Sequence, residues 1–365
     1  MTIGIGGAGC KIAARLDSEA VLVNVSETEL GKVDGGGRRL LASLHAGRGQ
    51  FKGSRKDPAI GLDAYLSVKR ELLPLIRGNY VFSSTGGGTG NGICTGILRD
   101  LSEEEHIATE DKTFFALLLP YARLESSEFV SNTSDFLAGP LAEAIDSGNT
   151  GNIVLFSNSV KFEQKLSEED FNAMLVDSLR QFFAVPDKND RLRLLDGHID
   201  HEDFALFLSK PYFNHFTCFD YDAQQSFEKQ LAKHPNPLLL PPENPIEALF
   251  LLEVPSGADP TIFYDIVEHF TARNVSPIYS VVENPDIERP FISVALLYSR
   301  KPAELVNDFN KIAEKHAQAK VQKSLDQYVT LEKLNVNLAD EAKAALKQRG
   351  DEEGILDILK RIGRL

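Results

Sequence analysis

The sequence predicts an α/β fold: an N-terminal Rossmann-like domain with a parallel sheet, one long central helix, and a second, smaller α/β domain with a mixed sheet. Three observations support this. Short apolar runs alternate with segments of helical periodicity over residues 3–158, which is typical of parallel strands joined by crossover helices. Residues 167–182 keep apolar positions at helical spacing. Beyond a proline-rich stretch at 231–245, three further apolar runs indicate another sheet.

The first half of the chain supplies most of the predicted elements. Helical spacing after the first strand involves Ile12 and Leu16. A region rich in glycine, arginine and lysine reads as a loop around one short helix at 31–61. The expected strands cover 3–5, 20–25, 80–84, 114–120 and 152–158, and further helices cover 62–77, where Pro74 would disturb the last turn, and 127–146.

The second half begins with the long helix, and its apolar face consists of Phe171, Met174, Leu175, Leu179 and Phe182. The charged stretch 186–203 predicts a loop. Three runs then read as strands, with a helix at 260–273 between the first two. The expected division is an N-terminal domain (1–165), the central helix (166–185), a loop and connecting region (186–245), a sheet domain (246–300), and C-terminal helices with a tail (301–365).

Composition narrows the classes of function. The chain has 365 residues, 42% of them apolar and 25% charged, which is an ordinary globular balance. A net charge of −14 argues against direct nucleic-acid binding through a basic surface. Cys10, Cys94 and Cys218 show no metal or disulfide spacing, so we expect no metal site in the chain itself and a reducing, cytoplasmic location. No signal peptide and no membrane span are expected.

Two glycine-rich segments, 4–10 and 86–92, each follow a strand and precede a helix. A helix N-terminus offers unpaired N–H groups and a partial positive charge, so it binds anions such as phosphate. The alternative is that each segment is only a tight turn. No Walker A motif is present. The first segment matches G-x-G-x-x-G, but a dehydrogenase would place an acid where Asn24 ends the second strand, and this reading leaves the second segment unexplained.

The segment GGGTGNG at 86–92 resembles the G-G-G-T-G-[ST]-G signature of the tubulin/FtsZ superfamily of polymerising GTPases, with Asn91 in the Ser/Thr place. Further segments resemble motifs of this family, and they occur in the family's order. The resemblance is closest to the FtsZ and TubZ branches. The segments are GIGGAGCK, VLVNVSETEL, LPYARLESSE, LFSNS and DGHIDHEDF.

The resemblance implies binding of GTP or GDP with Mg²⁺. One loop would line the α- and β-phosphates, a second the β- and γ-phosphates, and 45–53 would sense the γ-phosphate. The place where the family has an Asn on the central helix falls on Leu175 or Val176, which leaves selectivity for GTP over ATP open. The implied nucleotide contacts are Gly6, Gly7, Ala8, Gly9, Cys10, Lys11, Asn24, Gly86, Gly87, Gly88, Thr89, Gly90, Asn91, Glu125 (ribose), Asn158 (guanine) and Phe171 (base).

The resemblance further implies that a neighbouring copy completes the active site. Asp200 and Asp203 would be its catalytic acids, with His198 in place of the family's Asn. The chain would then form head-to-tail filaments that hydrolyse GTP, with a role in prokaryotic cell division or DNA segregation. The departures from the family pattern keep a second reading open, a non-hydrolysing nucleotide-binding scaffold or assembly regulator. Residues 354–365 would form either a packed terminal helix or a segment that recruits an adaptor protein.

Overall fold

The computed structural model describes residues 1–43, 53–233 and 245–299, and a few positions between 309 and 322. Most of the predicted sensing loop and of the proline-rich stretch, and all of the tail at 354–365, lie outside the described residues. The chain divides into two compact units, Met1–Asn310 and Lys311–Leu365, and the description below concerns the first. Among the described helices, none has the length and apolar character that crossing a membrane requires.

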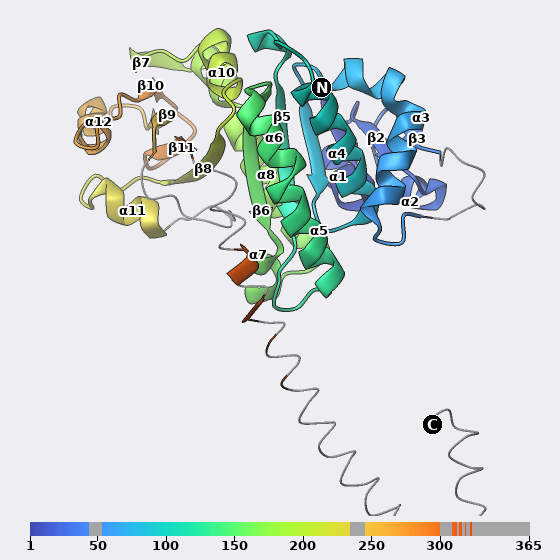
Figure 1. Cartoon of the computed structure of the whole chain (residues 1–365). Helices are drawn as coiled ribbons and strands as arrows, with labels where there is room; N and C mark the ends of the chain where they lie inside the picture. The colour runs from blue at the N-terminus through green and yellow to red at the C-terminus, as the bar shows by residue number, and fades with distance from the viewer. Residues whose placement is uncertain are drawn as a thin grey trace, which may run out of the picture. The chain divides into compact units, whose positions relative to one another are not determined.

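The N-terminal half forms the predicted parallel sheet (Figure 1). Its residues are buried on both faces in most strands, as expected for parallel strands covered by helices. All five strands predicted in this half are confirmed, and a sixth, short strand lies at the edge. In spatial order the strands are β3 (Arg39–Leu41), β2 (Val21–Asn24), β1 (Thr2–Ile5), β4 (Tyr80–Ser84), β5 (Thr113–Leu119) and β6 (Thr150–Ser157).

The helices of this half are α1 (Gly6–Leu16), α2 (Glu27–Gly31), α3 (Pro58–Ile76), α4 (Gly88–Ser102), α5 (Ser127–Ala138), α6 (Pro140–Ser147) and α7 (Asn158–Glu163). The helical stretch predicted at 127–146 is confirmed, but it consists of two helices, α5 and α6. Two helices meet there because Gly139 leaves the helical conformation, at φ −103° and ψ −101°, and Pro140 starts the next helix. Pro74 lies within the last turn of α3, which ends at Ile76.

The long central helix is confirmed as α8 (Glu168–Phe183), and the hydroxyl of Ser167 caps its N-terminus. The loop predicted at 186–203 is wrong. This stretch contains α9 (Val185–Arg191), the strand β7 (Arg193–Gly197) and the start of α10 (His201–Leu208). β7 is an edge strand that pairs only with β10, so most of its residues are exposed and several are charged. The sequence of β7 therefore lacks the apolar pattern by which the other strands were predicted.

The second sheet is mixed, as predicted. Its strands are β8 (Phe213–Asp220), β9 (Glu247–Val254), β10 (Ile278–Glu283) and β11 (Phe291–Tyr298), together with the edge strand β7. The helices α11 (Phe227–Lys233) and α12 (Phe263–Thr271) lie beside them. Only β9 and β10 run parallel within it. Ile153 of β6 pairs with Phe213 of β8, so the two sheets join into one of eleven strands, in the order β3-β2-β1-β4-β5-β6-β8-β11-β9-β10-β7.

Candidate functional site

The two glycine-rich segments meet at one edge of the sheet. β1 and β4 are parallel neighbours, with Ile5 opposite Ser83, so their carboxyl ends lie side by side. From these ends α1 begins at Gly6 and α4 at Gly88, and neither helix has a side-chain cap at its N-terminus. Their first N–H groups therefore remain available to a ligand, and both helix dipoles favour an anion there.

Most glycines in these segments are required by contacts within the protein. A Cβ on Gly9 would lie 2.1 Å from the carbonyl oxygen of Phe82 in β4. A Cβ on Gly88 would lie 2.6 Å from the backbone nitrogen of Asp57, and one on Gly92 would lie 2.1 Å from the carbonyl oxygen of Pro58. These distances are far below any normal contact. Much of the glycine signature thus serves close packing of α1 on β4 and of α3 on α4.

Gly7 and Gly87 differ from these glycines. A Cβ on Gly7 would approach only the Oε2 atom of Glu29, at 3.5 Å, and one on Gly87 only the Oγ atom of Ser84, also at 3.5 Å. Neither glycine has a positive φ that would itself demand glycine. Open space lies above one glycine in each loop, which is where a ligand can approach the backbone closely.

The side chains of Cys10 and Lys11 do not face this space. The Cys10 thiol is buried, and its sulfur lies within hydrogen-bond distance of the carbonyls of Gly4 and Val23, at 3.3 and 3.5 Å; burial raises its pKa to about 12. The Lys11 ammonium donates to Glu168 of α8 at 2.6 Å. That hydrogen bond is the main reason why the pKa of Glu168 is lowered. A contact of these two residues with a ligand at this edge would thus involve the Cys10 backbone or a rearranged Lys11.

Asn24 lies at the carboxyl end of β2, on the same edge, and is buried. Its amide donates to Oε2 of Glu29 at 2.9 Å, and its side-chain oxygen accepts from the backbone N–H of Ser26 at 3.2 Å. Glu29, in α2, is a residue that the sequence prediction missed. The acidic first turn of α2 gave a helix-start signal, but nothing in the sequence paired Glu29 with Asn24.

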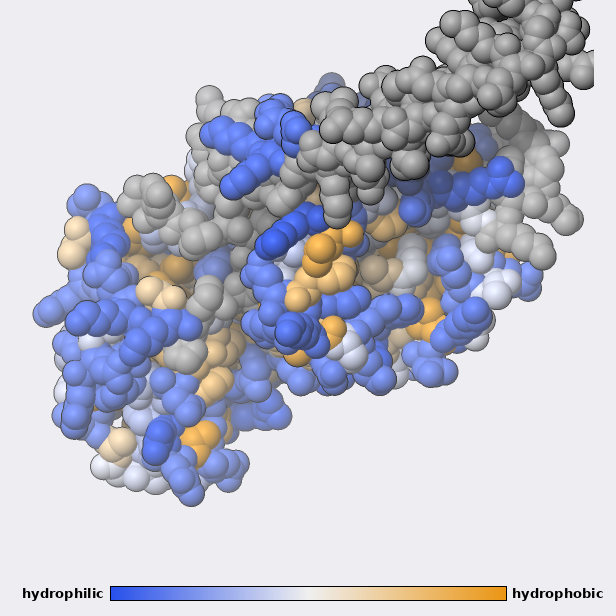
Figure 2. Space-filling view, turned by 90° about the horizontal axis from the view of Figure 1, so that it is seen from below, coloured by the Kyte–Doolittle hydropathy of each residue, from blue (hydrophilic) through white to orange (hydrophobic). Residues whose placement is uncertain are grey.

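Glu125 and Asn158, predicted at the ribose and the base, lie together at this edge. Glu125 follows β5, and Asn158 follows β6, the next strand of the sheet. The Asn158 amide donates to both carboxylate oxygens of Glu125, at 3.2 and 3.0 Å, and Oε2 of Glu125 also accepts from the backbone N–H of Tyr121. Figure 2 views this end of the molecule, where apolar side chains are exposed among hydrophilic ones.

The residues predicted near the base on α8 are buried in the core. Phe171 is 1% exposed, and Leu175 and Val176 belong to the same cluster of buried residues. Their neighbour Asn172 is 6% exposed, and no hydrogen bond from another described residue reaches its side chain. Of the residues that follow Phe171 on α8, Asn172 is thus a buried polar side chain next to the position predicted to contact the base.

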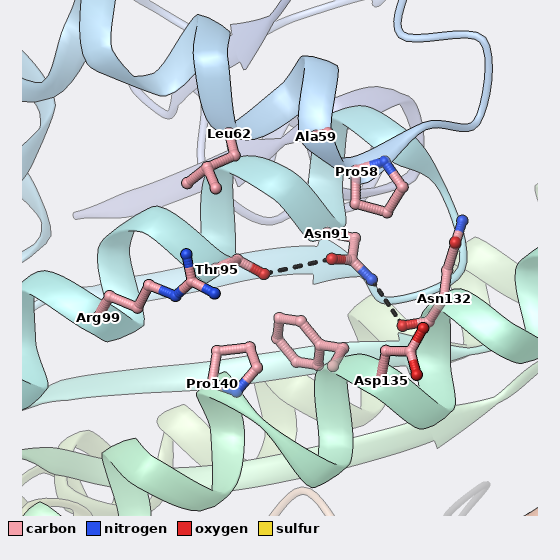
Figure 3. A pocket seen from close by; sticks show the side chains of 10 residues that line it. Pro58, Ala59, Leu62, Asn91, Thr95, Arg99, Asn132, Asp135 and Pro140 are labelled. Atoms are coloured by element: carbon pink, nitrogen blue, oxygen red, sulfur yellow. Dashed lines mark hydrogen bonds between the residues drawn. The ribbon is translucent and has the colours of Figure 1, made fainter.

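Asn91 binds the second glycine-rich segment to α5 (Figure 3). Its Nδ2 donates to the backbone carbonyls of Thr85, at 2.5 Å, and Asn132, at 2.9 Å, while its Oδ1 accepts from the Thr95 hydroxyl at 3.3 Å. Asn91 is 3% exposed. Through these hydrogen bonds Asn91 connects the start of α4 to the end of β4 and to α5. Asn91, Thr95 and Asn132 line a groove of about 330 Å³ between α3, α4, α5 and α6, into which Arg99 also points.

The predicted catalytic acids lie at the start of α10. Asp200 is the N-cap residue, and its Oδ1 accepts from the backbone N–H of Asp203 at 2.7 Å. His198 is exposed beside them. His201, the first residue of α10, lies 3.3 Å from Asp190 of α9. The acids are half-buried, so part of each carboxylate faces outward.

These acids belong to the opposite edge of the sheet. The amide of Asn152, near the amino end of β6, donates to the carbonyls of Phe207 and Lys210 at 2.9 Å, which fixes the end of α10 there. Asn158 lies just beyond the carboxyl end of this strand, six residues after Asn152, and six residues of strand span roughly 20 Å. Figure 1 shows α10 on the side of the N-terminus and α7 at the other end of the sheet. The acids and the glycine loops of one chain therefore lie at opposite ends.

A metal site is not evident among the described residues, since no group of three or more His, Cys, Asp or Glu side chains comes together in them.

The sequence matches no protein-family model and no curated protein. Solved structures do match. TubZ of Clostridium botulinum phage c-st is 18% identical in sequence and matches with a TM-score of 0.62. The match covers 87% of this chain and 98% of that chain. The FtsZ dimer of M. jannaschii is 17% identical, with a TM-score of 0.59 and coverages of 82% and 88%. The GTPγS-bound CetZ2 protofilament of Haloferax volcanii is 16% identical, with a TM-score of 0.61 and coverages of 87% and 98%. The predicted resemblance is thus confirmed in the architecture, and the chain has the tubulin/FtsZ fold.

Proposed function

We propose that this protein is a cytoplasmic GTPase that assembles head to tail into filaments and hydrolyses GTP between successive copies. One observation carries the proposal: two open helix N-termini lie at one edge of the sheet, and the acid pair lies at the other. A single copy cannot bring them together, whereas a second copy stacked on the first can. Such a contact joins two different surfaces, so it repeats without closing.

At the nucleotide edge, the backbone N–H groups near Gly7 and Gly87 would hold the phosphates of a nucleotide that binds together with Mg²⁺. A bound Mg²⁺ neutralises charge that develops on the phosphates during transfer. Glu125 would accept from the ribose. The Asn158 oxygen would accept from the N–H groups of guanine, a role for which it has no competing hydrogen bond among the described residues.

At the acid edge, the Asp200 and Asp203 carboxylates would reach the γ-phosphate of the next copy. Each can orient a water and accept its proton. Asp200 can do so while it caps α10, because the Asp203 N–H occupies only one of its oxygens. His198 would lie at the same contact. Leu124 after β5 and Leu206 on α10, 61% and 51% exposed, are large apolar side chains at the two ends that assembly would cover.

The decisive experiment mixes two inactive variants. Asp203→Ala keeps the nucleotide edge, and a variant with Gly87→Arg keeps the acid edge. Each alone should release almost no phosphate from GTP. In an equal mixture, one ordered pair in four has both intact surfaces, so activity should return to about a quarter of the wild-type rate. No recovery, with both variants folded, would contradict a shared active site.

A second candidate is a nucleotide-binding scaffold that assembles without hydrolysis. The involvement of Asp200 in capping α10 and the exposed His198 in place of an Asn favour it. Phosphate release and light scattering, measured in parallel with GTP, ATP and a slowly hydrolysed GTP analogue, separate the two. Assembly with GTP without any phosphate release identifies the scaffold.

A further inference from the structure

A strained turn precedes α3. Arg55 and Lys56 both have positive φ values, 52° and 65°, although neither is glycine. Two successive residues in the left-handed region are unfavourable unless the surroundings hold them. The same turn lies against the second glycine-rich segment, because a Cβ on Gly88 would meet the Oγ atom of Ser54 and the backbone of Asp57, each at 2.6 Å.

α5 holds this turn through three contacts. Nδ2 of Asn132 donates to the carbonyl of Lys56 at 2.8 Å. The ammonium of Lys56 lies 3.4 Å from a carboxylate oxygen of Glu128 and 4.9 Å from the ring centre of Phe129. The Lys56 side chain is about half exposed, so its ion pair is screened by water, and the Asn132 hydrogen bond is the contact to the backbone itself.

Asn132 also holds the glycine segment. Its Nδ2 donates to the carbonyl of Gly86 at 2.9 Å, and its backbone oxygen accepts from Asn91 at 2.9 Å. One side chain thus bonds the backbone of both segments, the turn at 55–56 and the start of the glycine segment. Among the described residues, no other side chain donates to both of these carbonyls.

We propose that Asn132 is a positioning residue that fixes the strained turn and the glycine segment in the arrangement that a triphosphate requires. This inference rests on the proposed nucleotide function. Asn132 would not touch the nucleotide and would act through Gly86 and Lys56. The turn follows residues 45–53, which the family resemblance assigns to the γ-phosphate, so loss of Asn132 should weaken GTP binding more than GDP binding.

The test compares Asn132→Ala with Asn79→Ala in the full chain. Asn79 is a matched control because it is also half-buried and also donates to two backbone carbonyls, those of Leu75 and Arg77 at 2.9 Å, at the opposite edge of the sheet. Hydrogen exchange without nucleotide should accelerate about tenfold at 53–57 and 86–91 in the Asn132 variant only. Its affinity for GTP should fall about tenfold, and its affinity for GDP less than about twofold.

The exchange measurement and the binding measurement can fail separately. If the wild type binds neither nucleotide, the proposed function is wrong, whereas exchange still decides whether Asn132 holds the two segments. Unchanged exchange in both segments, or equal weakening of GTP and GDP, overturns the inference. If Asn132→Ala fails to fold, Asn132→Asp keeps the size of the side chain but loses both donated hydrogen bonds, and it should show the same accelerated exchange.

Discussion

Replacing Gly87 by alanine should separate ligand binding from folding. Gly87 is the N-cap of α4, with φ −79° and ψ 161°, a conformation that alanine adopts readily. The added Cβ would meet only the Ser84 hydroxyl, at an ordinary 3.5 Å. Alanine is a poorer N-cap than glycine, but it also reduces the entropy of the unfolded chain. These terms roughly cancel, so the free energy of unfolding should change by less than about 1 kcal/mol.

Ligand binding should respond far more strongly. The added methyl group would occupy the open space through which a phosphate reaches the first N–H groups of α4. A hydrogen bond to a charged group contributes roughly 1.5–3 kcal/mol. Losing one such bond corresponds to a rise of roughly 10- to 150-fold in the dissociation constant for GTP.

Titration with a fluorescent GTP analogue and thermal unfolding, performed on the same samples, measure both quantities. Gly92→Ala is the matched control from the same signature, because its Cβ would lie 2.1 Å from the carbonyl oxygen of Pro58 and 2.5 Å from the backbone nitrogen of Leu62. α3 would have to shift, which costs about 1–3 kcal/mol, so this variant should lose stability first. Unchanged GTP affinity in Gly87→Ala would refute the assignment of this loop to phosphate.

Three further predictions concern catalysis, a buried ion pair and pH. Asp200→Asn keeps a good N-cap and should retain stability within about 0.5 kcal/mol, while phosphate release falls at least about 100-fold; retained hydrolysis would exclude Asp200 as a catalytic acid. Glu253→Ala removes the 2.6 Å partner of the largely buried Lys188 ammonium and should cost about 3–5 kcal/mol in urea unfolding; a loss below about 1 kcal/mol would show that this pair is not needed. Burial lowers the pKa of His215 from 6.5 to about 4, so the unfolded state binds the proton first as the pH falls. The free energy of unfolding should therefore drop by about 2 kcal/mol between pH 7 and pH 5, and His215→Leu should flatten this slope.

The sequence predicted best what depends on local pattern. Alternating apolar runs located the strands, and the glycine segments, each following a strand, located the edge where the helices begin. These features follow from periodicity and backbone conformation, which neighbouring residues determine. The helix break at Gly139 was missed although Gly-Pro is a common signal, because the apolar spacing continues across it.

Hydrogen bonds between residues that are distant along the chain could not be predicted from the sequence. Asn132 lies on α5 among other polar residues, and nothing in its surroundings indicates that it bonds Lys56 and Gly86, which are distant along the chain. Similarly, Asn91 reads in the sequence as a departure from a family signature. In the structure the Asn91 side chain donates to the backbone of Asn132 and so connects the start of α4 to α5. An amide can serve this purpose because it donates to two carbonyls at once.

Because the glycine loops and the acids lie at opposite edges, the number of complete active sites in an assembly differs from the number of copies. In the proposed filament, a row of n copies joined head to tail would contain n − 1 complete sites. The copy at one end would keep a nucleotide that no neighbour can attack, and the copy at the other end would present acids without a substrate. Turnover per copy would then rise with length and level off, and the two ends of the filament would differ chemically, because only one of them would carry a triphosphate that no neighbour can hydrolyse.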